Sequence, residues 1–103
     1  RVPVKVLVMD NRCLGMVHQW QHLFYGERYS STLLDANPDF VKLAESYGAH
    51  GIRVTEPDQV EDALRQAKAW TDAPTLIEFM IATEELVLPM VKSGNPMSEM
   101  ILK

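Results

Sequence analysis

Cysteine is nearly absent from this sequence of 103 residues, which contains only Cys13. One cysteine cannot form an intramolecular disulfide or a cysteine-rich metal framework. Long hydrophobic runs are absent too, because no segment approaches the ~20 apolar residues of a membrane span. No charged stretch followed by an apolar one marks a signal peptide. We therefore expect neither a disulfide scaffold, nor a membrane span, nor a secretory leader.

An excess of positive charge is also lacking, since 14 acidic residues outnumber 10 lysines and arginines and leave a net charge of -4. Nucleic acids and anionic membranes are bound by basic surfaces, so neither is an expected partner. What the chain does contain is 47% hydrophobic and 23% charged residues, a composition typical of one small globular unit.

The first half of the sequence predicts a strand followed by a helix and a loop. Residues 4–9 form a nearly continuous apolar run, which is typical of a strand covered on both faces in a parallel sheet. A helical period begins at Leu14 and is expected to end at Gly26. Residues 28–36 are polar and irregular, and this composition predicts a loop.

Two more helices and two more strands are expected in the second half. Asn37 is the predicted N-cap of a helix that has Pro38 in its first turn and Gly48 at its end. A short strand at 51–54 precedes a helix that starts near residues 55–58, and 75–81 predicts the last strand. The predicted buried face of this third helix consists of Val60, Ala63, Leu64, Ala67 and Trp70.

Alternation of strands and helices predicts an α/β fold with a parallel sheet and right-handed crossovers. Ligands of such sheets bind beyond the carboxyl ends of the strands, so the loop at 10–15 is the first candidate site. Three strands leave two open edges, which favour pairing with further strands. Because the sequence lacks a starting Met and opens almost directly on a strand, we interpret 1–103 as part of a larger domain, with 82–103 as an irregular tail.

Three groups of polar residues are candidate sites. Asp10-Asn11 at a strand end could bind a hard cation such as Mg²⁺, although spacing alone favours an Asx turn that caps the next helix. His18 and His22 have the i, i+4 spacing of zinc helices, but no third ligand is evident, and we interpret them as surface or cleft histidines. The carboxylates of Glu84 and Glu85 would point to opposite sides of an extended segment and make a poor acid/base pair.

A family resemblance changes this balance. Residues 4–20 resemble the second half of the thiamine-diphosphate motif of the acetohydroxyacid (acetolactate) synthases, which closes with Asn-Asn or Asp-Asn, here Asp10-Asn11. The run Leu14-Gly15-Met16-Val17-x-Gln19-Trp20 is specific to that family, and the similarity continues through 24–30, 37–40 and 85–94. The opening Gly-Asp-Gly of the motif is not in this sequence.

The resemblance implies roles for individual positions. The side-chain oxygen of Asn11 would ligate Mg²⁺, and the backbone carbonyl of Cys13 would be a further ligand. Trp20 corresponds to a tryptophan that narrows the substrate channel and contacts inhibitors, and Ser93 to a second inhibitor-contact position. Without the resemblance, Trp20 would be a core aromatic and Ser93 a turn residue. The segment lying along the diphosphate and thiazolium would consist of Asn11, Arg12, Cys13, Leu14, Gly15 and Met16.

Departures from the family pattern affect the expected substrate preference more than the cofactor. Asp10 stands where Asn is frequent, Arg12 where Gln or Glu is commoner, and His18 where the family varies. None of these departures removes a ligand oxygen.

The fold implied by the resemblance is the C-terminal part of a doubly wound parallel-sheet domain that binds thiamine diphosphate, with three strands, three helices and an irregular tail. The implied activity is condensation of pyruvate with a second 2-keto acid, pyruvate or 2-ketobutyrate, with loss of CO₂, in branched-chain amino-acid biosynthesis. The catalytic glutamate of the family lies in another domain, so this chain alone is expected to be inactive.

The family also implies cofactors, partners and location. Mg²⁺ accompanies thiamine diphosphate, and FAD binds elsewhere in the parent enzyme. Partners would be the rest of the catalytic subunit, further copies of it and a small regulatory subunit. The parent would be cytoplasmic in a bacterium and plastidic in a plant or alga. Two alternatives remain open: another thiamine-diphosphate decarboxylase or carboligase, and a non-catalytic α/β interaction module.

Overall fold

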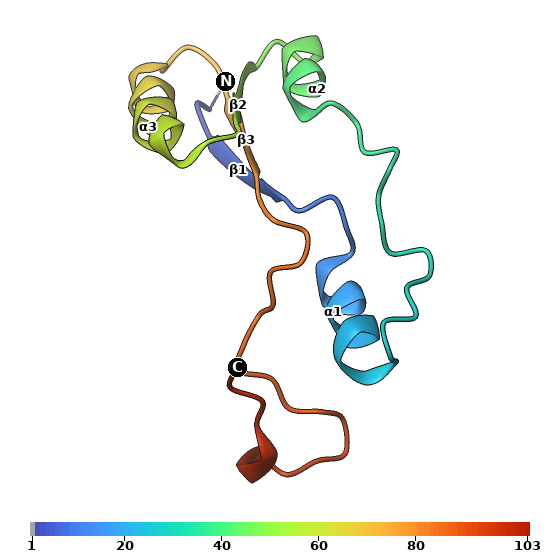
Figure 1. Cartoon of the computed structure of the whole chain (residues 1–103). Coiled ribbons are helices and arrows are strands. Elements are labelled where there is room, and N and C mark those ends of the chain that lie inside the picture. Colours follow the sequence, from blue (N-terminus) through green and yellow to red (C-terminus); the bar gives the residue numbers. More distant parts are fainter. Residues whose placement is uncertain (1) are drawn as a thin grey trace. The chain divides into compact units, whose positions relative to one another are not determined.

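The computed structural model describes residues 2–103, which fold as two compact units (Figure 1). The first unit holds the described residues up to Asn11 and Ala36–Ile81, and the second holds Arg12–Asp35 and Ala82–Lys103. In chain order the elements are β1 (Lys5–Asp10), α1 (Gly15–Phe24), α2 (Phe40–Ser46), β2 (His50–Val54), the 3₁₀ turn η1 (Pro57–Gln59), α3 (Val60–Ala69), β3 (Thr75–Met80) and the 3₁₀ turn η2 (Met97–Glu99).

The first unit is built on a parallel sheet with the order β1-β3-β2. Lys5 and His50 both pair with Thr75, so the three strands start level. The last strand in the sequence is therefore the central one, and most of its side chains are buried. This arrangement confirms the predicted α/β fold with three parallel strands and three helices.

One face of the sheet is covered by α3 (Figure 1). Small side chains let this helix approach the strands, and Ala63 and Ala67 pack with Val54, Ile77 and Phe79 in a single buried cluster. Ile77 at its centre is fully buried.

Two members of the predicted buried face of α3 behave differently from expectation. The prediction that Leu64 is buried is wrong, because 43% of it is exposed. It lines an open pocket together with Leu7 of the edge strand β1. Trp70 is only partly buried and caps the helix instead of belonging to it.

The other face of the sheet is covered by α2. The prediction that Asn37 caps this helix is wrong: the N-cap is Asp39, whose carboxylate accepts a hydrogen bond from the Lys42 amide. The Asn37 side chain instead donates to Asp10 at the end of β1. Gly51 of β2 lies so close to α2 that a Cβ atom there would be 2.9 Å from the Val41 carbonyl oxygen.

The second unit contains α1, the loop that follows it and the C-terminal tail. An isolated antiparallel bridge joins Cys13 to Leu33, and another joins Met90 to Ile101. Apart from η2 and this bridge, the tail has no regular structure, as predicted. No helix in residues 2–103 is long and apolar enough to cross a bilayer.

Candidate functional site

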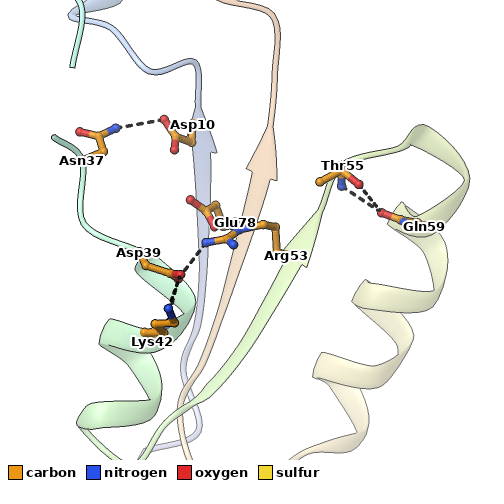
Figure 2. A network of polar contacts seen from close by, with 8 residues as sticks. All are labelled: Asp10, Asn37, Asp39, Lys42, Arg53, Thr55, Gln59 and Glu78. Atoms are coloured by element: carbon orange, nitrogen blue, oxygen red, sulfur yellow. Dashed lines mark hydrogen bonds and ion pairs between the residues drawn. The ribbon is translucent and has the colours of Figure 1, made fainter. Parts of the chain in front are cut away.

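The carboxyl end of β1 carries the first candidate residues (Figure 2). Asp10 is buried, and its Oδ1 accepts a hydrogen bond from Asn37 Nδ2 at 3.2 Å. Its main-chain oxygen accepts the Ile81 amide at 3.0 Å, which extends the ladder to β3. Asn11 follows at once and is the last residue of this part of the first unit. The predicted cation ligand thus leaves the sheet from a strand end that is fixed by main-chain and side-chain bonds.

A network of charged side chains joins the start of α2 to strands β2 and β3, on the face of the sheet that α2 covers (Figure 2). Glu78 of β3 is 3% exposed, and its Oε2 accepts a hydrogen bond from Arg53 Nε at 2.6 Å. Arg53 Nη2 donates to Asp39 Oδ1 at 2.8 Å. The hydrogen bond from Lys42, followed by the charge of Arg53, holds the pKa of the Asp39 carboxyl below its ordinary value.

Sequence reasoning missed this network. The signal that could have found it is a lone carboxylate, Glu78, in the otherwise apolar strand. A buried carboxylate requires a partner, and the partner is Arg53, which faces Glu78 directly across the parallel pair of β2 and β3.

The segment 12–14 belongs to the second unit, where the loop after α1 holds it. The Leu34 amide donates to the Arg12 carbonyl and the Leu14 amide to the Thr32 carbonyl, both at 2.8 Å. In an antiparallel bridge of this type the central residues do not exchange main-chain bonds. The carbonyl of Cys13 is therefore directed away from Leu33, an orientation that suits a carbonyl metal ligand.

The Cys13 side chain is buried and lies 3.9 Å from the Thr83 carbonyl, measured from Sγ. Burial, followed by the charge of Glu84, raises the pKa of its thiol. A neutral buried thiol behaves as a small hydrophobic side chain, and this packing role is compatible with a separate role for the carbonyl of the same residue.

The start of α1 has features that suit an anion. Leu14 at the N-cap makes no side-chain cap, and the first turn from Gly15 through Met16 contains no acidic residue. The first amides of a helix have no partners within it and attract negative charge. Diphosphate is an anion of the kind that helix starts bind, and amide and carbonyl oxygens are ligand types that Mg²⁺ accepts. No three His, Cys, Asp or Glu side chains gather into a metal cluster anywhere in residues 2–103.

The two histidines of α1 are held by the loop that follows. His18 is 4% exposed, so its interpretation as a surface or cleft residue is wrong. Its Nδ1 lies 3.2 Å from Thr32 Oγ1, its Nε2 lies 3.3 Å from Glu84 Oε1, and its ring stacks on Tyr29 at 4.3 Å. His22 Nδ1 meets the hydroxyl of Tyr29 at 2.9 Å. Both rings are thus engaged by protein groups.

Gln19 attaches the tail to α1. Gln19 is 3% exposed, and its side chain makes two hydrogen bonds with the main chain of Val87, one as acceptor and one as donor. Oε1 accepts the Val87 amide at 2.7 Å, and Nε2 donates to the Val87 carbonyl at 3.0 Å and to Met90 Sδ at 3.1 Å. Two motifs of the family resemblance, around Gln19 and around Met90, therefore meet in the structure.

Trp20 lies beside an open groove of ≈ 390 Å³ that is lined by Val17, Trp20, Gln21, Tyr25 and Arg28. With 39% of its surface exposed, Trp20 does not have the burial of a core residue. Its ring meets Phe24 edge-on at 6.2 Å, and the Lys92 ammonium group lies 5.7 Å from the centre of the Phe24 ring. Ser93 is the next residue after Lys92 and is exposed.

Comparison with known proteins shows the family of this chain. Residues 1–79 match the family described as thiamine pyrophosphate enzyme, C-terminal TPP binding domain, and the chain belongs to this family. It is 46% identical over 102 residues to the acetolactate synthase of Mycobacterium bovis and 47% identical over 103 residues to the large subunit of acetolactate synthase isozyme 2 of Escherichia coli. A probable acetolactate synthase large subunit of Methanocaldococcus jannaschii is 43% identical over 100 residues.

These matches cover 95%, 100% and 97% of this chain, but only 16%, 19% and 17% of the respective relatives. The chain therefore spans less than a fifth of the length of the relatives it matches. Membership of the family shows that this chain is a domain of the thiamine pyrophosphate-binding type. It does not by itself assign the activity of a whole enzyme to this chain.

Proposed function

We propose that this chain is the C-terminal part of the cofactor-binding domain of an acetolactate synthase large subunit. The observation that carries the proposal is the combination of near-complete coverage at 43–47% identity to such subunits with a parallel sheet whose β1 ends at Asp10-Asn11. The whole protein would condense pyruvate with pyruvate or 2-ketobutyrate and release CO₂.

In this proposal the residues after β1 hold the cofactor. Asn11 supplies its side-chain oxygen and Cys13 its carbonyl to Mg²⁺, while the residues from Arg12 to Met16 lie along thiamine diphosphate. The cofactor, when bound, supplies the carbon nucleophile and electron sink of the reaction, and the chain supplies binding, orientation and charge. The start of α1, which has no side-chain cap, and the direction of the Cys13 carbonyl away from Leu33 support these roles.

Trp20 and Ser93 would line the substrate and inhibitor channel. The groove beside Trp20 and its partial exposure favour a channel wall over a plain core position. The FAD site, the catalytic glutamate and the remaining ligands would lie in other parts of the protein, together with contacts to further catalytic subunits and a small regulatory subunit. The names of the relatives, several of which are large subunits, support a partner subunit.

Of the two alternatives, another thiamine-diphosphate decarboxylase or carboligase keeps the same cofactor site and differs in substrate. A non-catalytic module would bind no cofactor. Calorimetric titration of the whole protein with Mg²⁺ and thiamine diphosphate separates the module from both enzymes, and product analysis with pyruvate separates the two enzymes.

The metal assignment is tested by replacing Asn11 with Ala in the whole protein. We expect weaker retention of Mg²⁺ and cofactor, because a hard cation loses one oxygen ligand that no other group replaces. Asn95→Ala is the control, since Asn95 pairs with Glu99 in the tail. Unchanged dependence on Mg²⁺ and cofactor in Asn11→Ala would refute the assignment.

A further inference from the structure

The network behind the end of β1 connects all three strands with the start of α2 (Figure 2). Arg53 is its centre, because its Nε binds the buried Glu78 of β3 at 2.6 Å and its Nη2 binds Asp39 at 2.8 Å. Asp39 is the N-cap of α2, so Arg53 joins the helix start to the middle of the sheet.

The helix start is in turn joined to the end of β1. Asn37 lies two residues before Asp39, with Pro38 between them, and its amide donates to Asp10 Oδ1 at 3.2 Å. A proline fixes one backbone angle and makes this connection stiff. A displacement of Asp39 would therefore move Asn37, and with it the contact to the side chain of Asp10, the residue that precedes Asn11.

We propose that Arg53 is a positioning residue for the metal end of the cofactor site, acting through Asp39 and Asn37 on the Asp10-Asn11 strand end. The inference rests on the proposed function, because it deepens the assignment of Asn11 as a Mg²⁺ ligand. Groups that orient metal ligands from behind influence metal affinity without touching the ion.

The geometry of the network argues for positioning beyond simple stabilisation. The Arg53–Glu78 pair alone would satisfy the buried carboxylate, since the two residues face each other across neighbouring strands. The second bond, from Nη2 to Asp39, adds nothing to Glu78 but ties α2 to the sheet. A planar guanidinium can hold two carboxylates in fixed directions, which an ammonium group cannot do.

Two variants of the whole protein separate positioning from stability. Asp39→Ser retains an N-cap, because Ser caps helices as well as Asp does, and it leaves the Arg53–Glu78 pair intact. We expect its dissociation constant for Mg²⁺, at saturating thiamine diphosphate, to rise about two- to fivefold, the effect of losing one partly exposed ion pair. The double variant Arg53→Met, Glu78→Met removes both members of the pair, so that no unpaired charge stays buried, and should raise the constant about tenfold.

The matched control is Arg65→Met. Arg65 also pairs with two carboxylates, Glu61 at 2.6 Å and Asp62 at 2.9 Å, but on the exposed side of α3. The Mg²⁺ affinity of the Arg65→Met variant should equal that of the unchanged protein. Binding is measured by calorimetry and by the rise of melting temperature with Mg²⁺, and kcat at saturating Mg²⁺ should stay near its original value in all three variants.

The outcomes distinguish this inference from the proposed function. Weaker Mg²⁺ binding in both network variants, with kcat recovered at high Mg²⁺, supports positioning by Arg53. Lower melting temperatures with unchanged Mg²⁺ affinity would show that the network only stabilises the fold, and would overturn the inference while Asn11→Ala still weakens binding. If the unchanged protein binds neither Mg²⁺ nor thiamine diphosphate, the proposed function fails as well.

Discussion

Replacing Gln19 with Ala should release the tail from α1. In the second unit the Gln19 side chain makes two hydrogen bonds with the main chain of Val87, at 2.7 and 3.0 Å, and contacts Met90 Sδ. Each such bond contributes a net ~0.5–1.5 kcal/mol, so losing both lowers the free energy of local opening at Val87 by about 2 kcal/mol. This loss corresponds to roughly a 30-fold faster amide exchange, because 1.4 kcal/mol is about a factor of ten.

Hydrogen exchange of individual amides measures this effect. The control is Gln21→Ala, which removes a partly buried glutamine of the same helix whose side chain bonds to Ser30 and Thr32 of the loop after α1 and not to the tail among the described residues. Exchange at Ile77, in the centre of the sheet, serves as an internal reference for global unfolding. We expect acceleration at Val87 in Gln19→Ala alone. An unchanged exchange rate at Val87, or equal acceleration in both variants, would refute the role of Gln19 as the attachment point of the tail.

Two further predictions concern the channel and the acid stability. Trp20→Leu should lower the preference for 2-ketobutyrate over pyruvate by about tenfold, since apolar walls discriminate by ~1–3 kcal/mol. A free energy of unfolding lowered by ~3–5 kcal/mol, measured by thermal melting, with an unchanged acceptor ratio would make Trp20 a core residue. A hydrogen bond from His50 holds the pKa of the Asp72 carboxyl below its ordinary value. The pair therefore stabilises the fold fully at pH values above the pKa that Asp72 has in the unfolded chain, and this stabilisation is lost as the pH falls through the lower pKa of the folded state. The melting difference between Asp72→Asn and the unchanged chain should therefore shrink on acidification; a pH-independent difference would contradict it.

Local sequence signals predicted the elements with small errors. Sequence patterns located all three strands to within one residue. Only the central strand β3 is mostly buried. The prediction that the first strand is covered on both faces is wrong, because Leu7 and Met9 of the edge strand β1 are 49% and 62% exposed. Gly48 was predicted at the end of a helix and has the positive φ of 70° that such a position favours. The N-cap of α2 was misplaced by two residues, because Asn37 and Asp39 are equally good capping residues by type and only tertiary contacts choose between them.

The candidate site was only partly visible in the sequence. Family motifs pointed to Asn11 and Trp20, and the structure shows a strand end and an open groove at these two places. The burial of His18 was not foreseen, because a histidine on an amphipathic helix gives no local indication of the Tyr29 ring that stacks on it. The bond between Gln19 and Val87 joins residues 68 positions apart, a distance at which no sequence pattern reports contact.

The sequence by itself determined the class of fold and the family, because periodicity, capping residues and a specific motif are local properties of the chain. The tertiary structure decided which strand is central, since β3 lies between β1 and β2 although it comes last. This placement sets Glu78 opposite Arg53 and buries it. A carboxylate buried in a low-dielectric interior is costly unless a positive group pairs with it. Only the packing of the sheet determines that this group is Arg53 and that a second guanidinium nitrogen of Arg53 binds Asp39.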